Sequence, residues 1–199
     1  MNQVAAAASD YKKELRKRYF QEFRACIEVD SLVVRNQYRL IQSLCNVAKR
    51  YWRAGSNVLV YDPLKSEVDW LNGLLKASFA LEKIHFFLPH WYTGGRMDFR
   101  SARLIKYPGR GKLRVEKNYT VLPRKQIDFI LVPGLYIDRS GYRLGRGGGF
   151  YDRFLCQIAK EKTWFLALDW QMKNSLPVEK HDIRIGNIIT ESGVFRTYF

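Results

Sequence analysis

Residues 128–155 read DFILVPGLYIDRSGYRLGRGGGFYDRFL. The stretch opens with a short apolar run that stops at Pro133 and Gly134, which is typical of a strand buried on both faces. Four glycines then stand beside two arginines, and a helix is predicted from about Gly148 to Lys160. A buried strand, a glycine-rich loop and a helix in this order indicate one unit of an α/β protein.

The remainder of the chain continues this alternation of helices and strands. Apolar residues at helical spacing predict helices from Asp10 to about Cys26 and from Ser31 to Trp52, and another in VDWLNGLLKASFAL. Strands are predicted in NVLVYD, IHFFLP, TWFLALDW and NIITE, and the segments MDFRSARLIKY and KLRVEKNYTVL are predicted to form a hairpin or meander. We therefore expect an α/β fold over residues 1–199: a single three-layer α/β/α domain with a mostly parallel sheet and a small additional strand meander. Residues 1–9 are expected to be disordered.

The composition favours an anionic partner. The 199 residues carry a formal net charge of +15, and residues 100–125 hold nine Lys or Arg side chains against one acid. That density suits a nucleotide, a polycarboxylate or a nucleic acid, and a solvated basic face is the alternative for each single residue. The chain shows no apolar run long enough to span a bilayer, no signal-peptide pattern, and three cysteines without metal-binding or disulfide spacing. We expect a cytoplasmic protein with reduced thiols in its core.

The glycine-rich loop does not match the common nucleotide-binding fingerprints. Gly145 and Gly147 fit the first two glycines of G-x-G-x-x-G, but Phe150 stands where the third is needed. The other glycine-rich segment, PGRGKL at 108–113, lacks the spacing and the Ser or Thr of a Walker A loop.

The same loop still has the properties of a phosphate site. Successive glycines let backbone N–H groups converge on an anion, and the N-terminus of the following helix adds partial positive charge. Arg143 and Arg146 are able to form charge-assisted contacts with phosphate oxygens. Asp152, in the first helical turn, is placed to hold a magnesium ion, and an ordinary helix N-terminal acid is the alternative reading.

The stretch VPGLYIDRSGYRLGRGGGFYDRFL resembles the signature of the 5-formyltetrahydrofolate cyclo-ligases, also called 5,10-methenyltetrahydrofolate synthetases. Weaker similarities to this family occur in KKELR, SEVD, MDFR and LPVEKHDIRIGNIITE, in the family's order. The resemblance covers nearly the whole chain. It implies ATP- and Mg²⁺-dependent closure of 5-formyltetrahydrofolate to 5,10-methenyltetrahydrofolate through a phosphorylated formyl group, with release of ADP and phosphate.

The resemblance also assigns residues to roles. Arg146 and Tyr151 are expected to be catalytic, and Asp152 and Asp182 to bind the metal. The expected ATP-binding residues are Lys12, Arg16, Arg143, Leu144, Gly145, Arg146, Gly147, Gly148, Gly149, Phe150 and Tyr151. The expected substrate-binding residues are Asp62, Glu67, Arg146, Gly147, Gly148, Gly149 and Phe150. His181 is expected to be structural rather than catalytic.

Several positions depart from the family pattern. The segment YDPLKSE leaves the contacts near Asp62 and Pro63 open, and His90 stands where many members have arginine. The alternatives are therefore an ATP-binding relative with another substrate or a regulatory role, and a nucleic-acid-binding module. The main expectation is a monomer that binds ATP and 5-formyltetrahydrofolate, with neither nucleic acid nor membrane as a partner. Part of the basic stretch 100–125 is expected to steer or hold the polyglutamate tail of the folate.

Overall fold

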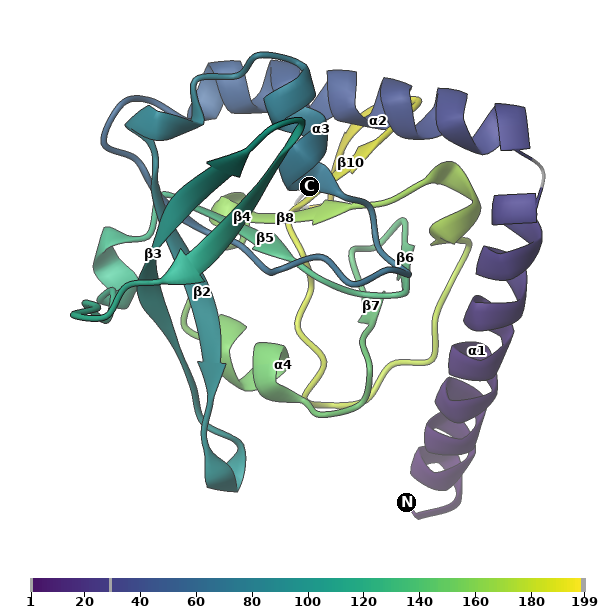
Figure 1. Cartoon of the computed structure of the whole chain (residues 1–199). Helices are drawn as coiled ribbons and strands as arrows, with labels where there is room; N and C mark the ends of the chain where they lie inside the picture. The colour runs from purple at the N-terminus through teal and green to yellow at the C-terminus, as the bar shows by residue number, and fades with distance from the viewer. Residues whose placement is uncertain (1, 29, 198–199) are drawn as a thin grey trace.

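The computed structural model describes the backbone of residues 2–28 and 30–197, and the side chains of residues 7–25 and 35–197. Figure 1 shows a long α2 lying across the sheet and α1 standing at its side. The helices are α1 (Asn2–Glu28), α2 (Asp30–Tyr51), α3 (Trp70–Lys76) and α4 (Phe150–Leu155). Among the described residues, no helix has both the length and the apolar character needed to cross a bilayer.

The strands form one large sheet and one small one. The eight-stranded sheet has the order β11-β10-β8-β5-β1-β2-β3-β4, and the three-stranded sheet has the order β7-β6-β9. The strands are β1 (Asn57–Leu59), β2 (His85–Trp91), β3 (Met97–Tyr107), β4 (Arg110–Val115), β5 (Phe129–Val132), β6 (Tyr136–Asp138), β7 (Arg143–Leu144), β8 (Thr163–Leu166), β9 (Met172–Lys173), β10 (Asn187–Thr190) and β11 (Gly193–Arg196).

The five central strands of the large sheet are parallel, and its edges are antiparallel. Strands β10, β8, β5, β1 and β2 pair in parallel, whereas β11 pairs antiparallel with β10. At the other edge, β2, β3 and β4 form the predicted antiparallel meander. The mostly parallel sheet and the meander are thus confirmed, and the meander is continuous with the main sheet.

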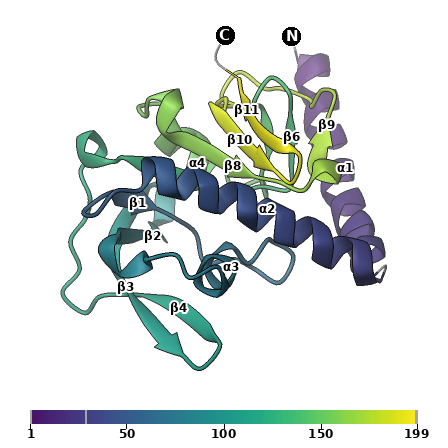
Figure 2. The same ribbon diagram turned by 90° about the horizontal axis from the view of Figure 1, so that it is seen from above.

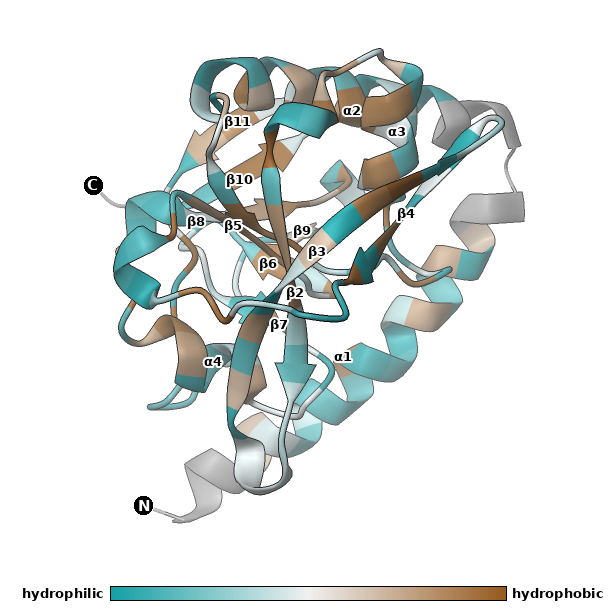
Figure 3. Cartoon of the chain, turned by 60° about the vertical axis from the view of Figure 1, so that its left-hand side comes forward, coloured by the Kyte–Doolittle hydropathy of each residue, from teal (hydrophilic) through white to brown (hydrophobic). Residues whose placement is uncertain are grey.

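Both faces of the large sheet are covered. On one face, α2 and α3 pack on the strands through residues such as Leu44 and Trp70, which are fully buried. On the other face, α4 contributes Phe154 and Leu155, and the small sheet contributes Ile137. Viewed from above, α2 crosses the strands while the β3–β4 hairpin projects away from the body (Figure 2). The apolar residues concentrate on the strands, and α1 is largely hydrophilic on its outer side (Figure 3).

Three local expectations were wrong. Helix α1 begins at Asn2 and not at the predicted Asp10, and the run of alanines there has the highest helix propensity. Helix α4 ends at Leu155, well before the predicted Lys160. Cys45 is a buried free thiol as expected, but Cys156 is exposed, and the side chain of Cys26 lies outside the described residues.

Candidate functional site

A cavity of about 500 Å³ opens at the carboxyl ends of β1 and β5. Strand β1 leads into β2 on one side, and the chain later returns to place β5 on the other side of β1. This reversal of strand order leaves a crevice between the loops that follow the two strands, where ligands bind in open α/β sheets. Tyr61 and Asp62 after β1, and Pro133 and Gly134 after β5, line the cavity.

Every residue expected to bind ATP, substrate or metal lines this one cavity. They come from α1, from the loop after β1, from the contiguous stretch of β7, the glycine-rich loop and α4, and from the loop before β10. The set is Lys12, Arg16, Asp62, Glu67, Arg143, Leu144, Gly145, Arg146, Gly147, Gly148, Gly149, Phe150, Tyr151, Asp152 and Asp182. The geometry therefore brings the predicted residues together, and their individual roles stay predictions.

The glycine-rich loop connects β7 with α4 along one wall of the cavity. Gly147 and Gly149 have φ angles of +102° and +62°, which L side chains rarely adopt, so glycine suits both positions. The carbonyl oxygen of Gly145 accepts a hydrogen bond of 2.9 Å from Nε of Arg16 on α1. Helix α1 thus holds the glycine-rich loop through Arg16.

Arg143 and Asp152 form a buried ion pair beside the loop. The distance from Arg143 Nη2 to Asp152 Oδ1 is 3.2 Å, and the side chains are 5% and 16% exposed. The same Asp152 oxygen accepts the N–H of Ile183 at 3.2 Å. Among the described residues, Nε of Arg143 has no hydrogen-bond partner although it is buried. A buried guanidinium with unused donors at a cavity wall fits an anionic ligand.

Tyr151 presents a second unused donor. Its hydroxyl is buried and has no hydrogen-bond partner in the described part of the chain. Burial raises the pKa of the Tyr151 hydroxyl and Arg143 opposes this, so the group is a neutral donor at physiological pH. A buried hydroxyl without a partner is costly for a protein, and a ligand oxygen in the cavity would satisfy it.

Arg146 spans the cavity from the glycine-rich loop to the loop after β1. Its Nη2 lies 3.1 Å from Ser66 Oγ and 3.3 Å from Glu67 Oε1. The Glu67 side chain is only 7% exposed, whereas that of Arg146 is 43% exposed. The other Glu67 oxygen accepts the N–H of Leu64 at 3.0 Å, which fixes the carboxylate toward Arg146.

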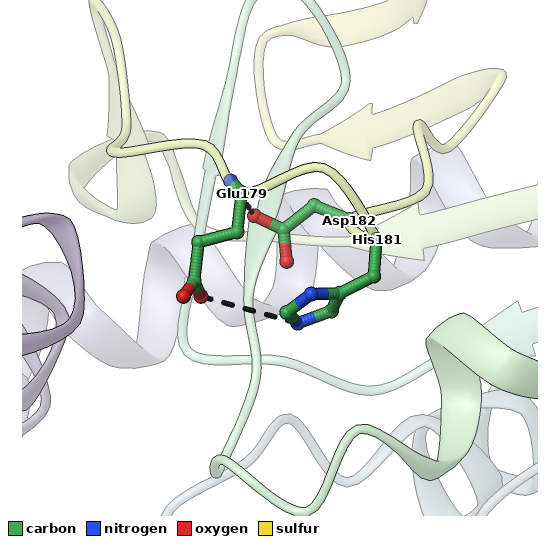
Figure 4. A group of neighbouring side chains, drawn as sticks. All are labelled: Glu179, His181 and Asp182. Carbon is green, nitrogen blue, oxygen red and sulfur yellow. Dashed lines mark hydrogen bonds and ion pairs between the residues drawn. The ribbon is translucent and has the colours of Figure 1, made fainter. Parts of the chain in front are cut away.

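Lys12 is held between two carboxylates. Its Nζ lies 2.6 Å from Glu179 Oε2 and 2.6 Å from Asp182 Oδ2, with 8% of the lysine side chain exposed. Figure 4 shows Glu179, His181 and Asp182 grouped on the loop before β10, and the backbone N–H of Glu179 donates to Asp182 at 2.7 Å. The imidazole of His181 is 3.9 Å from Glu179 and is 68% exposed. His181 thus lines the cavity from its solvent side.

The carboxylates at this edge of the cavity are of the kind that binds magnesium, and the Lys12 ammonium holds the same position between them. Glu179, His181 and Asp182 place one ligand atom each within 4.8 Å of one another. Magnesium prefers carboxylate oxygens and commonly takes one or two of them together with phosphate oxygens. Glu179 and Asp182 offer such oxygens, whereas imidazole is a poorer ligand for this ion. Asp152 is not part of this group, because its carboxylate faces Arg143 and the N–H of Ile183.

Helix α1 delivers Lys12 and Arg16 from one face, since the two residues are one helical turn apart. The helix is anchored on the small sheet: Leu15 and Tyr19 pack against Tyr136 of β6 in a separate apolar cluster. The Tyr136 hydroxyl donates to Glu22 at 2.8 Å. The docking of α1 therefore rests on contacts outside the cavity.

The apolar part of the cavity escaped the sequence analysis. Its wall beyond the loop after β1 is formed by Leu64, Leu88, Pro89, Trp91 and Val115. Trp91 and Leu64 are 53% and 52% exposed, which is unusual for such large apolar side chains and fits a flat apolar ligand. Strand patterning alone does not reveal that the end of β2 projects past the core to become a cavity wall.

Neither His90 nor most of the basic stretch 100–125 lies at the cavity. His90 is not among the cavity-lining residues of the described chain, and its ring packs edge to face on Tyr92 at 4.9 Å. Of residues 100–125, only Val115 lines the cavity among the residues the structure describes. Glu179, which sequence analysis missed, was signalled only by its position three residues before Asp182 in LPVEKHD.

Comparisons with known proteins show the family of this chain. A family model described as the 5-formyltetrahydrofolate cyclo-ligase family matches residues 8–191. The 5-formyltetrahydrofolate cyclo-ligase of Mus musculus is 27% identical over 206 residues, covering 94% of this chain and 97% of the mouse protein. The protein of the same name from Saccharomyces cerevisiae is 35% identical over 122 residues, which is 58% of this chain and 56% of the yeast protein.

Solved structures show the same fold. A 5,10-methenyltetrahydrofolate synthetase from Mycoplasma pneumoniae superposes with a TM-score of 0.69 at 22% identity, covering 90% of this chain and 98% of that one. The 5,10-methenyltetrahydrofolate synthetase of Aquifex aeolicus superposes with a TM-score of 0.68 at 27% identity, covering 94% and 93%.

Proposed function

The chain belongs to the 5-formyltetrahydrofolate cyclo-ligase family and is a ligase, and from this premise we propose the reaction that its cavity performs. The protein uses ATP and Mg²⁺ to close 5-formyltetrahydrofolate into 5,10-methenyltetrahydrofolate, releasing ADP and phosphate. The observation that carries the proposal is the set of unused buried donors, Arg143 Nε and the Tyr151 hydroxyl, beside a glycine-rich loop. Such donors in a partly desolvated cavity favour a multiply charged phosphate ligand.

The chemistry requires activation of a poor electrophile. The N5-formyl group is an amide, so its oxygen first attacks the γ-phosphorus of ATP, the bond to ADP breaks, and an iminium phosphate forms. N10 then adds to the formyl carbon and loses its proton, and phosphate leaves with the C–O bond pair as the ring becomes unsaturated. Phosphoryl transfer of this kind depends on positioning and charge stabilisation and needs no covalent enzyme intermediate.

The cavity residues supply these two requirements. Arg143, Arg16 and the glycine-rich loop bind the triphosphate, and Tyr151 donates to an oxygen of the transferred group. Arg146 already reaches Glu67 on the opposite wall, so it joins the phosphate half of the cavity to the substrate half. Magnesium bound with ATP would neutralise charge on the phosphate oxygens, and Asp182 with Glu179, or Asp152, would hold it.

The apolar wall and Glu67 fit the folate. The side chains of Trp91 and Leu64 offer exposed apolar surface for a flat ring system. The Glu67 side chain is buried in the cavity wall, and carboxyl oxygens accept hydrogen bonds, so it pairs with ring N–H donors. Asp62 also lines the cavity, and we propose that it is a further contact to the substrate.

The basic residues 100–125 act on the glutamate tail from a distance. The exposed Arg103 and Arg114 stand opposite each other on the β3–β4 hairpin, a like-charge juxtaposition that attracts anions. Because these side chains do not line the cavity, their effect is long-range steering and is weakened by salt. A polyglutamylated substrate therefore gains affinity at low salt.

One assay tests the proposed function. The purified protein is incubated with 5-formyltetrahydrofolate, Mg²⁺ and ATP, and the near-ultraviolet absorbance of the methenyl product is followed. We expect ATP-dependent product formation, and a lower KM for polyglutamylated than for monoglutamylated substrate at low salt that converges at high salt. Absence of product beside an active control enzyme refutes the cyclo-ligase, and retained ATP binding in that case indicates the relative with another substrate. Equal salt dependence for both substrates refutes the steering role.

Tyr151→Phe is expected to lower kcat/KM by roughly 10- to 100-fold, because the variant loses one hydrogen bond to a charged oxygen. Its free energy of unfolding should rise by about 1 kcal/mol in the ligand-free protein, since the hydroxyl is buried without a partner among the described residues and its removal relieves that cost. Tyr136→Phe is the matched control: it loses the bond to Glu22 and about 1 kcal/mol of stability, and it keeps turnover. The reverse pattern, measured by urea unfolding and initial rates, would contradict the assignment.

A further inference from the structure

Arg153 lies outside the cavity yet holds two parts of its rim. It is an exposed residue on the outer side of α4 and is absent from the cavity lining. Its Nε donates to the carbonyl oxygen of Gly95 at 2.9 Å, and its Nη2 donates to the carbonyl oxygen of Gly148 at 2.8 Å. Gly95 lies in the turn Thr93–Gly95 that joins β2 to β3, and Gly148 lies in the glycine-rich loop.

The two segments are shaped to admit this guanidinium. A Cβ on Gly95 would lie 2.6 Å from Arg153 Nη2, and a Cβ on Gly149 would lie 2.7 Å from Nη1. Both glycines also have positive φ angles, +80° and +62°. The planar fork of arginine reaches two carbonyl oxygens at once, which the ammonium of lysine does not reproduce.

The bond to Gly148 has a consequence on the cavity side. In a trans peptide the C=O of one residue and the N–H of the next point in opposite directions. Because Arg153 holds the Gly148 carbonyl on the outside, the N–H of the same peptide unit, which belongs to Gly149, points toward the cavity that Gly149 lines. A backbone N–H held in this orientation by a glycine-rich loop is available to an anion in the cavity.

We propose that Arg153 is a positioning residue that clamps the β2–β3 turn to the glycine-rich loop and thereby directs the Gly149 N–H at the bound phosphates. The turn follows the strand end that carries Trp91 and Pro89, so the clamp also sets the separation between the apolar wall and the loop. Arg153 acts through these backbone groups and touches neither ligand. The kinetic part of this inference rests on the proposed function.

The test measures the clamp without turnover first. Hydrogen exchange of the ligand-free protein should become about tenfold faster at residues 92–96 and 145–150 in Arg153→Ala and in Arg153→Lys. The dissociation constant for ATP, measured by calorimetry, and the KM for ATP should each rise roughly 5- to 10-fold. The kcat should stay within about twofold of the wild-type value. The control is Arg124→Ala, which removes a guanidinium stacked 4.9 Å from the ring of Phe154 on the same helix.

The outcomes separate the two proposals. Faster exchange in both segments together with weaker ATP binding, absent in Arg124→Ala, supports the clamp. Unchanged exchange in either segment overturns it, and so does faster exchange with unaltered ATP affinity. If the wild-type protein forms no methenyl product, the proposed function fails while exchange and calorimetry still decide the role of Arg153.

Discussion

Asp152→Asn is expected to reduce kcat/KM by roughly 10²- to 10³-fold while leaving the chain folded. The change removes the negative charge that pairs with Arg143 at 3.2 Å and the carboxylate oxygen proposed to bind magnesium. The asparagine oxygen still accepts the N–H of Ile183, so the loop before β10 keeps its anchor. Both asparagine and alanine leave the buried Arg143 guanidinium without its counter-charge, which costs roughly 3 to 5 kcal/mol in buried pairs. Asparagine is preferable because its side-chain oxygen still offers a hydrogen-bond acceptor beside the guanidinium.

The control for this variant is Asp128→Asn. Asp128 also accepts one backbone N–H, that of Asn57 at 2.9 Å, but it does not line the cavity. Initial rates and circular dichroism of both variants are compared with the wild type. Turnover within threefold of wild type in Asp152→Asn, with Mg²⁺ at saturation, would refute the catalytic importance of this carboxylate.

Lys12→Met is expected to lower the free energy of unfolding by about 2 kcal/mol and to weaken ATP binding. The substitution leaves Glu179 and Asp182 side by side without the ammonium that now lies 2.6 Å from each. Removal of one member of a buried ion pair costs roughly 3 to 5 kcal/mol. The expected loss is smaller because Glu179 is 26% exposed and solvent reaches its carboxylate.

Mg²⁺ is expected to raise the stability of the same variant. With the ammonium gone, millimolar Mg²⁺ should restore part of the lost stability, because a cation that binds the folded state stabilises it. Lys13→Met is the control, since Lys13 is 67% exposed and its pair with Asp10 contributes less than about 1 kcal/mol. Urea unfolding with and without Mg²⁺ measures both effects. Equal losses in the two variants would show that the bridge by Lys12 is not what stabilises the loop.

The longer helices and strands were predictable because their buried faces space apolar residues regularly along the sequence. The strand at 129–132 is buried at every position, and the period of α2 follows from Leu40 and Leu44 on one face. The small sheet was not predicted, since β7 and β9 have two residues each and leave no pattern of their own. The start of α1 was missed for a related reason: alanines carry helix propensity but no amphipathic period.

The site was predictable where residue order alone defines it. The glycine-rich loop, Arg143 and Asp152 lie within one short stretch, so their proximity follows from the chain itself. Glu179 and Arg153 were not found, because their importance arises from contacts with Lys12 and with the Gly95 carbonyl, which are distant in sequence. Trp91 escaped for the same reason: only the register of β2 with β3 shows that it lies beyond the core.

The bond between Lys12 and Asp182 joins residues 170 positions apart and so bears on how the protein is made. During synthesis, α1 leaves the ribosome before the rest of the domain, and the loop that neutralises Lys12 follows only after most of the domain has been translated. Contacts of such sequence separation form late and slow the folding of a chain. Until the small sheet has been synthesised, Leu15 and Tyr19 of α1 have no apolar surface to pack against. We therefore expect chaperones to bind this helix in the nascent chain.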